Sequence, residues 1–222
     1  MNKLLSSVAI ALVACVTLVS AQAQELQGDA KVGAKKNAMC IGCHGIVGYQ
    51  ASFPEVHKVP KISGQGAAYI ASALNAYKKG DRKHPTMRGI AASLSDQDIA
   101  DLSAFYAASG VTEGATALAA APAATGDAAA LVAKGNCVSC HGASLSAPIA
   151  PSYPRIAGQH GDYLFVALKS YKADAANPQV GRNNAIMGGI AKQFSNAELK
   201  QIAGYVSSLP TDLKTVPESR FR

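Results

Sequence analysis

The chain of 222 residues contains no tryptophan, and aromatic residues make up only 6% of it. Surfaces that bind nucleic acids usually combine clustered lysine and arginine with aromatic side chains that stack on bases. Although the formal net charge is +7, the basic residues form no cluster and are not interleaved with aromatic residues. The composition therefore does not favour a nucleic-acid-binding function.

Long apolar runs are also scarce. Outside the first 23 residues, no apolar segment approaches the length of about 18 residues that a membrane-spanning helix needs. At the N-terminus, Lys3 precedes an apolar stretch over Val8–Val19 and the small-residue sequence Ala21-Gln22-Ala23. This order of segments is typical of a secretory signal peptide. We predict that residues 1–23 are cleaved after Ala23 and that the mature protein is periplasmic.

A second interpretation of the same region centres on Cys15. The sequence Leu12-Val13-Ala14-Cys15 resembles the processing site of bacterial lipoproteins, in which the cysteine becomes the lipidated first residue. We favour the signal peptide, because Val16–Val19 keep the next segment apolar where a processed lipoprotein usually turns polar. Anchoring through Cys15 is the less favoured alternative.

Cysteine is rare too, and four of the five cysteines fall into two copies of one motif. The copies are Cys40-Ile41-Gly42-Cys43-His44 and Cys137-Val138-Ser139-Cys140-His141. The pattern C-x-x-C-H is the attachment motif of c-type haem. On a helix, residues i and i+3 share a face, so both thiols can add to the vinyl groups of one haem while the histidine binds the iron. The sequence therefore predicts two covalently bound haem c groups.

Three other interpretations of the cysteine pairs are less favoured. Two C-x-x-C pairs can close one zinc site, but zinc modules usually bring their pairs within about 20 residues. A thioredoxin-like pair would follow a buried strand, and no run of β-branched residues precedes either motif. A disulfide within each pair suits an oxidising compartment, but it explains neither the histidines nor the duplication.

The second half of the chain repeats the first. The sequence Pro60-Lys61-Ile62-Ser63-Gly64-Gln65 matches Pro154-Arg155-Ile156-Ala157-Gly158-Gln159. Further along, Tyr69, Tyr77, Arg82, Met87 and Ser95 correspond to Tyr163, Tyr171, Arg182, Met187 and Ser195. The second copy carries six extra residues near Asn177-Pro178-Gln179. Such repetition indicates two copies of one structural unit.

The segment between the copies is rich in Ala, Gly and Thr and has too few large apolar residues to build a core. We predict an N-terminal domain over residues 24–111, an alanine-rich linker over 112–125 and a C-terminal domain over 126–222. Each domain is small for an independent hydrophobic core. A buried haem would supply the apolar centre that the side chains lack.

The apolar spacing predicts an all-α fold. Helices are expected over 29–38, 66–79, 127–134 and 161–173, where apolar residues recur at helical spacing. The sequences that begin at Ser95 and Ser195 are typical of capping boxes at the start of each copy's last helix, with Asp98 the poorer match and Glu198 the better one. The core is expected where the first and last helices of each copy cross. No convincing strand pattern is present.

A haem that carries electrons needs a second axial ligand, and a thioether is the usual high-potential choice. Met87 and Met187 hold matching positions, each five residues after an arginine and two before a glycine, in segments that we expect to be loops. Met39 adjoins Cys40 and is too close in the chain to reach the opposite face of the haem. We predict the iron ligands listed next: His44 with Met87, and His141 with Met187.

The other histidines are weaker candidates. His84 lies three residues before Met87 and could compete for the iron, but Asn184 takes its place in the second copy. His57 and His160 have no histidine counterparts in the other copy, so we expect both at the surface or in loops.

Three pairs of residues at matching positions are candidates for tuning the haems. An iron-bound imidazole normally donates its other N–H to a carbonyl, and a proline carbonyl can accept that bond. Arginines near a haem can pair with its propionates, and tyrosines can pack at its edge. The candidates for these roles are Pro60 and Pro154, Arg82 and Arg182, and Tyr77 and Tyr171.

Together the two C-x-x-C-H motifs, the repeated P-x-I-x-G-Q sequence, the R-x-x-x-x-M segments and the terminal helices resemble the class I cytochromes c. The duplication resembles the dihaem cytochrome c4 family over roughly Asp29–Pro210. The resemblance implies two all-helical domains, each wrapped around one haem with His and Met ligands. It also implies haem edges close enough for electrons to pass between them. The alanine-rich linker and the six-residue insertion depart from the family pattern.

The resemblance implies a periplasmic electron carrier and not an enzyme, because an iron with two protein ligands has no open position for a substrate. It would carry one electron per haem from a quinol-oxidising cytochrome complex to a terminal oxidase or reductase, docking transiently as a monomer. The alternatives are a dihaem peroxidase, a gas-binding sensor and a fixed electron-entry subunit of a larger redox complex. The first two require a vacant or labile iron position.

Overall fold

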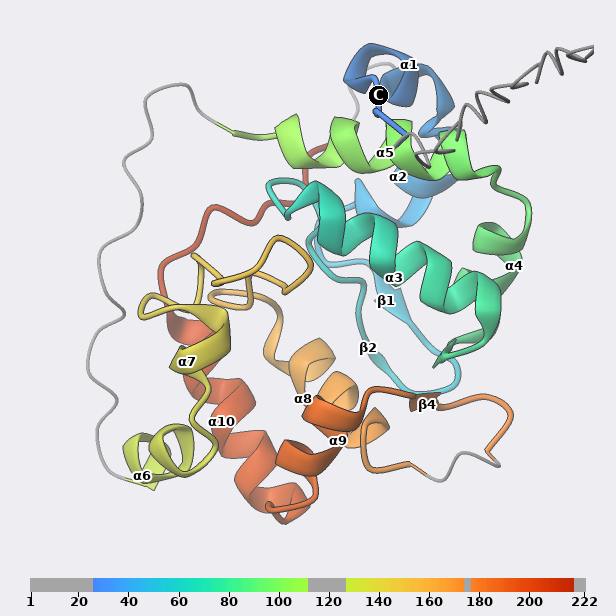
Figure 1. Ribbon diagram of the computed structural model, residues 1–222. Coiled ribbons are helices and arrows are strands. Elements are labelled where there is room, and N and C mark those ends of the chain that lie inside the picture. The colour runs from blue at the N-terminus through green and yellow to red at the C-terminus, as the bar shows by residue number, and fades with distance from the viewer. Residues whose placement is uncertain (1–25, 112–126, 174–176, 218–222) are drawn as a thin grey trace, which may run out of the picture.

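The computed structural model describes residues 26–111, 127–173 and 177–217 (Figure 1). The first unit contains α1 (Ala30–Lys36), α2 (Ala38–His44), β1 (Gln50–Ala51), β2 (His57–Lys58), α3 (Ala67–Lys79), β3 (Arg82–Lys83), α4 (Pro85–Ala92) and α5 (Asp96–Ala108). The second contains α6 (Asp127–Lys134), α7 (Val138–His141), α8 (Gly161–Ser170), β4 (Gly181–Arg182), α9 (Ala185–Ala191) and α10 (Asn196–Ser208). The predicted signal peptide with Cys15 and the predicted linker lie outside the described residues.

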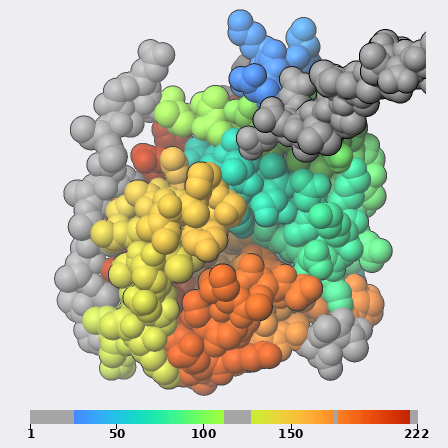
Figure 2. Space-filling model, in the orientation of Figure 1, coloured from blue at the N-terminus to red at the C-terminus, as the bar shows by residue number. Residues whose placement is uncertain are grey.

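The two units are built on the same plan, and Figure 2 shows them packed directly against each other. In each unit the first and last helices meet, and a middle helix, α3 or α8, packs on the last one. The predicted all-α fold with two tandem domains is therefore confirmed. Within the described residues, no helix is long and apolar enough to cross a membrane.

The first helix of the N-terminal unit approaches α5 at close range (Figure 1). A Cβ atom added to Gly33 would lie 2.2 Å from the backbone oxygen of Asp101, so only a glycine allows this approach. Asp29 caps α1 by accepting hydrogen bonds from the backbone N–H groups of Lys31 and Val32.

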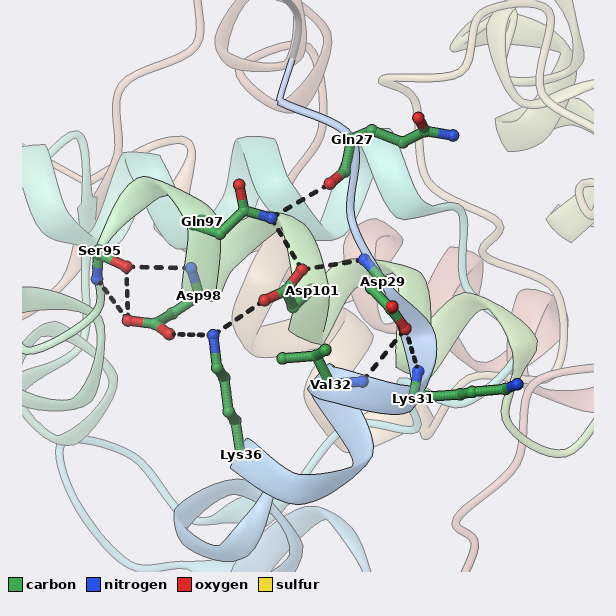
Figure 3. Close-up of polar contacts among 9 residues, drawn as sticks. All are labelled: Gln27, Asp29, Lys31, Val32, Lys36, Ser95, Gln97, Asp98 and Asp101. Atoms are coloured by element: carbon green, nitrogen blue, oxygen red, sulfur yellow. Dashed lines mark hydrogen bonds and ion pairs between the residues drawn. The ribbon is translucent and has the colours of Figure 1, made fainter.

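A cluster of polar residues stabilises the crossing of α1 and α5 (Figure 3). The buried carboxylate of Asp101 accepts hydrogen bonds from the Asp29 N–H at 2.9 Å, Lys36 Nζ at 2.8 Å and Gln97 Nε2 at 2.9 Å. Lys36 also pairs with Asp98 at 2.7 Å. The Asp29 N–H and the Lys36 ammonium lower the pKa of Asp101, so the carboxylate stays charged. Because Gln201 stands at the matching position, the second unit has no counterpart to the buried carboxylate of Asp101.

The core was expected where the first and last helices cross; this holds for the C-terminal unit, whereas in the N-terminal unit the core lies where α5 meets α2 and α3. In the N-terminal unit, Leu94, Ile99 and Leu102 are buried and pack against Cys40, Ala71 and Leu74. The C-terminal unit has the larger buried cluster, formed by Leu131, Leu145, Ala157, Leu164, Phe194, Leu199, Ile202, Ala203, Val206 and Leu209. In both units the first cysteine of the motif, Cys40 or Cys137, packs against this core, which holds the motif against the rest of the fold.

The expectation of no strands was wrong in detail, because the structure contains two small antiparallel pairs. Strand β1 pairs with β2 inside the first unit. Strand β3 pairs with β4 across the two units, with Arg82 opposite Arg182. Strands of two residues have no alternating pattern that a sequence can display, and the second pair forms only when the units meet.

The helix predictions hold with changes at their ends. Helix α6 has the expected bounds, and α3 begins one residue later than expected, with Gly66 at its N-cap. The predicted helix 29–38 is divided at Asn37 into α1 and α2, and α8 ends at Ser170. Both capping boxes form, including the one that uses Asp98.

Candidate haem-binding sites

Both C-x-x-C-H motifs line one continuous cavity of about 610 Å³ that extends across the junction of the two units. Helix α2 carries the first motif, and α7 carries the end of the second. The same cavity is lined by Met87 and Met187, so every sequence-predicted ligand faces this space. Within the described residues, no three His, Cys, Asp or Glu side chains are placed to hold a metal ion by themselves.

No disulfide joins the four motif cysteines. Burial raises the pKa of Cys40 and of Cys137. Cys40 packs on one apolar core and Cys137 on the other. A thiol fixed beside an apolar cavity is what the formation of a thioether to a haem vinyl group requires.

The two motif histidines are held in the same way. His44 Nδ1 lies 2.9 Å from the carbonyl oxygen of Pro60, and His141 Nδ1 lies 2.9 Å from that of Pro154. A carbonyl only accepts, so each Nδ1 carries the proton and donates it, which leaves Nε2 with a lone pair for a metal. Burial lowers the pKa of both histidines, although the bond to the proline carbonyl opposes this shift.

The two methionines lie on short helices and not in the loops that we expected. Met87 is on α4 and Met187 is on α9. Each helix is capped by the residue three positions before the methionine: His84 Nδ1 accepts from the Met87 N–H at 3.4 Å, and Asn184 Oδ1 accepts from the Met187 N–H at 2.9 Å. The caps fix the backbone of each methionine relative to the cavity.

His84, the predicted competitor for the iron, is thus engaged as a helix cap. Burial lowers the pKa of His84 to about 4, and the nearby His57, Arg82 and Arg182 contribute to the shift. The imidazole is therefore neutral at physiological pH, which allows Nδ1 to accept the backbone hydrogen bond.

The two sequence-predicted arginines meet at the junction of the units. Arg82 Nη2 donates to the Tyr163 hydroxyl at 2.7 Å, and Arg182 Nη2 donates to the same oxygen at 3.2 Å. Arg82 also donates to Tyr69 at 3.2 Å. Burial by itself would raise the pKa of Tyr163, but the two guanidinium groups lower it to about 8.

The predicted tyrosines contact these arginines. The Arg82 guanidinium lies 4.7 Å from the ring centre of Tyr77, and that of Arg182 lies 5.4 Å from the ring centre of Tyr171. Neither arginine forms an ion pair with a carboxylate of the described residues, and the buried Arg82 Nε has no hydrogen-bond partner there. Buried positive charge without a counter-charge is unfavourable, so the cavity fits a ligand with carboxylate groups.

The expectation that His57 lies at the surface or in a loop was wrong, because this residue is buried in strand β2. Its side chain is only 5% exposed, and Nδ1 donates to the Glu55 carbonyl at 2.9 Å. The ring packs against His84 and against Tyr163 of the other unit. His57 is buried because the second unit covers it, which the sequence around His57 does not reveal. His160 is half-buried at the N-cap of α8.

Sequence reasoning assigned no role to Tyr69, Tyr163, Gln65 and Gln159, which the structure places at this junction. Their only sequence signal is that they recur as matching pairs in the repeat. Repetition marks them as parts of the unit, but it does not indicate that they reach across to the other unit.

Comparison with known proteins agrees with this arrangement. Residues 31–107 and 126–210 each match the family model of cytochrome c. The cytochrome c4 of Pseudomonas aeruginosa is 30% identical over 216 residues, which cover 94% of this chain and 100% of that protein. A thiosulfate dehydrogenase electron acceptor of Stutzerimonas stutzeri is 31% identical, covering 86% of this chain and 90% of its own length.

Among solved structures, the reduced recombinant cytochrome c4 from Pseudomonas stutzeri superimposes with a TM-score of 0.59 at 26% identity. The match covers 82% of this chain and all of the other. Two haem-binding domains of the cytochrome c type, joined in tandem, therefore define the class of this molecule. Within that class the chain belongs to the cytochrome c4 family, and it is a dihaem electron-transfer cytochrome with two covalently bound haem c groups.

Proposed function

We propose that the protein is a periplasmic electron carrier in which each iron lies between an imidazole and a thioether. His44 and Met87 hold the first iron, and His141 and Met187 hold the second. One observation carries the proposal: in both units a histidine fixed by a proline carbonyl and a methionine on a capped helix line the same cavity.

This ligand set suits electron transfer. The haem supplies the one-electron Fe(III)/Fe(II) couple, and the thioether of methionine raises its potential by favouring the reduced state. If His44 with Met87 and His141 with Met187 hold the two irons, neither iron would have an open position for a substrate, and electrons would enter and leave through the haem edge. The apolar core of each unit, together with the histidine held by its proline carbonyl, would keep water from the iron and hold the ligands in place.

The arginine pair suits the propionates. Arg82 and Arg182 lie opposite each other on β3 and β4, within the cavity and without carboxylate partners among the described residues. Like charges placed opposite each other repel, and propionates would relieve that repulsion. Tyr77 and Tyr171 hold the guanidinium groups by cation–π contact. Pro60 and Pro154 would tune the irons through the hydrogen bonds that their carbonyls accept from His44 and His141.

We also propose that the chain is exported to the periplasm and that it consists of two domains joined by a linker. A cleaved signal peptide over 1–23 would export the chain, with domains over 24–111 and 126–222 joined by the linker. Lipid anchoring through Cys15 is the alternative that mass spectrometry of the mature protein tests. In the periplasm the carrier would dock transiently, as a monomer, on a quinol-oxidising cytochrome complex and on an oxidase or reductase.

A dehydrogenase is a second candidate donor. The relative from Stutzerimonas stutzeri is named a thiosulfate dehydrogenase electron acceptor, and it matches this chain over 86% of its length. Reduction kinetics with each donor separate the two, because a physiological donor should reduce the protein rapidly and with rates that fall as salt screens the docking surfaces. A subunit of a fixed complex would instead co-purify with its partner.

Spectra of methionine variants test the ligand assignment. In the oxidised wild type we expect only low-spin haem, with the charge-transfer band in the red that Met–Fe(III) ligation produces. Met87→Ala and Met187→Ala should each remove half of that band and lower the potential of one haem. Met39→Ala is the matched control, because Met39 is exposed and adjoins a cysteine of the motif.

Two results would contradict the carrier assignment. One is an unchanged spectrum in Met87→Ala or Met187→Ala. The other is a wild-type protein that contains high-spin haem and binds cyanide or peroxide at once, which would favour a peroxidase or a gas sensor.

A further inference from the structure

Two glutamines, one from each unit, cross the junction in opposite directions. Gln65 and Gln159 close the repeated P-x-I-x-G-Q sequence, and their side chains are 4% and 5% exposed. Each forms a pair of hydrogen bonds with one residue of the other unit. A buried side-chain amide that makes two hydrogen bonds keeps a fixed orientation. If it turned away, buried polar groups would lose their hydrogen-bond partners.

Gln159 forms two hydrogen bonds with the backbone of Lys61. The Lys61 N–H donates to Gln159 Oε1 at 3.0 Å, and Gln159 Nε2 donates to the Lys61 carbonyl oxygen at 2.8 Å. The contacts of Gln65 mirror these: the Arg155 N–H donates to Gln65 Oε1 at 2.9 Å, and Gln65 Nε2 donates to the Arg155 carbonyl oxygen at 2.9 Å. The two halves of the junction are thus related like the halves of a symmetric dimer.

The Lys61 N–H belongs to the same peptide group as the Pro60 carbonyl, which accepts the hydrogen bond of His44. One planar peptide therefore receives the imidazole proton on its oxygen and donates its own proton to the glutamine of the other unit. The same holds for the peptide between Pro154 and Arg155, which joins His141 to Gln65. Each motif histidine is two hydrogen bonds from a side chain of the opposite domain.

We propose that Gln159 tunes the haem of the N-terminal domain and Gln65 tunes the haem of the C-terminal domain, each through the peptide that holds the iron-ligating histidine. The inference rests on the ligand roles of His44 and His141 under the proposed function. Both glutamines are positioning residues, since neither touches the iron ligand itself.

The direction of the effect follows from the polarisation of the peptide. When the N–H of a peptide is hydrogen-bonded, its carbonyl oxygen becomes more negative and accepts a stronger hydrogen bond. A stronger acceptor at Nδ1–H makes the imidazole a more basic ligand, which favours the ferric iron. Each glutamine therefore holds the potential of the opposite haem below the value that this haem would have without it.

Substitution by methionine tests this crossed pattern, because methionine has a similar length and no hydrogen-bonding amide. The reduction potential of each haem is followed separately by the NMR signals of its methyl groups during a redox titration. Gln159→Met should raise the potential of the haem bound at Cys40 and Cys43 and leave the other nearly unchanged. Gln65→Met should do the reverse. Asn183→Ala is the control: it removes another side-chain hydrogen bond across the junction, from Asn183 Nδ2 to the Asp81 carboxylate at 3.2 Å, without touching either peptide.

The hydrogen bond between Lys61 and Gln159 can also be observed directly in the wild-type protein by NMR. In the reduced, diamagnetic protein, the hydrogen bond should give a scalar coupling between the Lys61 amide nitrogen and the side-chain carbonyl carbon of Gln159. In Gln159→Met, the His44 Nδ1 proton should exchange faster with solvent and move upfield.

The proposal is overturned if the coupling is absent. It is also overturned if the glutamine variants shift the haem of their own domain, shift both haems equally or shift neither. A purely structural role would change both haems, as a loosened junction does, and Asn183→Ala would then have the same effect. Failure of the proposed function is separately visible, because the wild-type spectrum would lack the Met–Fe(III) band before any glutamine is replaced.

Discussion

Replacement of Gly33 by alanine should destabilise the N-terminal domain. Gly33 lies where α1 meets α5, and an added Cβ would lie 2.2 Å from the backbone oxygen of Asp101 and 2.8 Å from the Cβ of Phe105. Neither atom is the free end of a flexible side chain, so rotation of a side chain cannot relieve the overlap. The helices must separate instead.

The size of the effect can be estimated. An ordinary contact of about 3.5 Å requires α1 to retreat by about 1 Å, and a gap of that size forfeits up to about half of the dispersion attraction across the crossing. Overpacking of this kind costs about 3 kcal/mol at the upper end of its usual range. Alanine regains about 1 kcal/mol of helix propensity. We therefore expect Gly33→Ala to lower the free energy of unfolding by about 2 kcal/mol.

The matched control is Gly204→Ala. Gly204 lies inside α10 of the other domain, and no atom would lie within 4 Å of an added Cβ. The same substitution should therefore stabilise the protein there by up to about 1 kcal/mol. Guanidinium unfolding of the holoprotein, followed by circular dichroism, measures both. Equal effects of the two substitutions, or a Gly33→Ala protein as stable as the wild type, would refute the reasoning.

Two further substitutions test the caps and charges of the last helices. Asp101→Asn should lower the free energy of unfolding by about 2 kcal/mol at neutral pH, because the charge-assisted hydrogen bond to Lys36 is lost. The control is Asp96→Asn, which removes an exposed ion pair with Lys78 and should cost less than about 0.5 kcal/mol. Folding lowers the pKa of Asp101, so this contribution to stability is present above the unfolded pKa of about 3.9 and disappears as the pH falls through the lower folded pKa. A stability difference between the wild type and Asp101→Asn that does not shrink in acid would contradict this prediction. Ser195→Ala removes the side chain that caps α10 and should cost about 1 kcal/mol in urea unfolding, with Ser208→Ala at the far end of the helix as the control.

The sequence was sufficient to predict what depends on local pattern. The helices follow from apolar spacing and from the capping boxes at Ser95 and Ser195, and the haem motifs follow from the spacing of cysteine and histidine. The helical setting of the methionines was missed because glycines at Gly89 and Gly189 suggested loops. Pro85 at the first position of α4, directly after the capping His84, was a helix signal that the sequence did contain.

Contacts between the two domains could not be predicted in the same way. The burial of His57, the meeting of Arg82 with Tyr163 and the crossing of the glutamines all depend on how one unit packs on the other. A repeat shows that two units are alike, but it contains no information on their relative orientation. Some of these contacts follow the repeat, because Arg82 lies opposite Arg182 and the two glutamines make mirrored contacts, as expected when two similar units associate about a pseudo-twofold axis.

The two domains fasten their first helices differently, which predicts unequal local stability. Helix α1 is held by Gly33 against α5 and by charged bonds from Lys36 to Asp98 and Asp101. Helix α6 contains no glycine and buries Leu131; its Lys134 donates to the Gln193 carbonyl at 3.0 Å but reaches Glu198 only at 3.8 Å, so α6 has no counterpart to the buried carboxylate that holds α1.

Segments with few buried contacts open at lower free energy than the core of a domain. In native-state hydrogen exchange of the holoprotein, we therefore expect the amides of α6 to exchange through a lower-energy opening than those of α1. The amides of α5 and α10, which carry the buried residues of their cores, serve as the reference within each domain. Because the cysteine pair that follows α6 is tied to the haem, this opening should leave the iron ligands in place, and the visible spectrum should stay unchanged while α6 exchanges. Equal opening energies for α1 and α6 would show that the glycine crossing and its charged cluster do not determine how firmly the first helix is held.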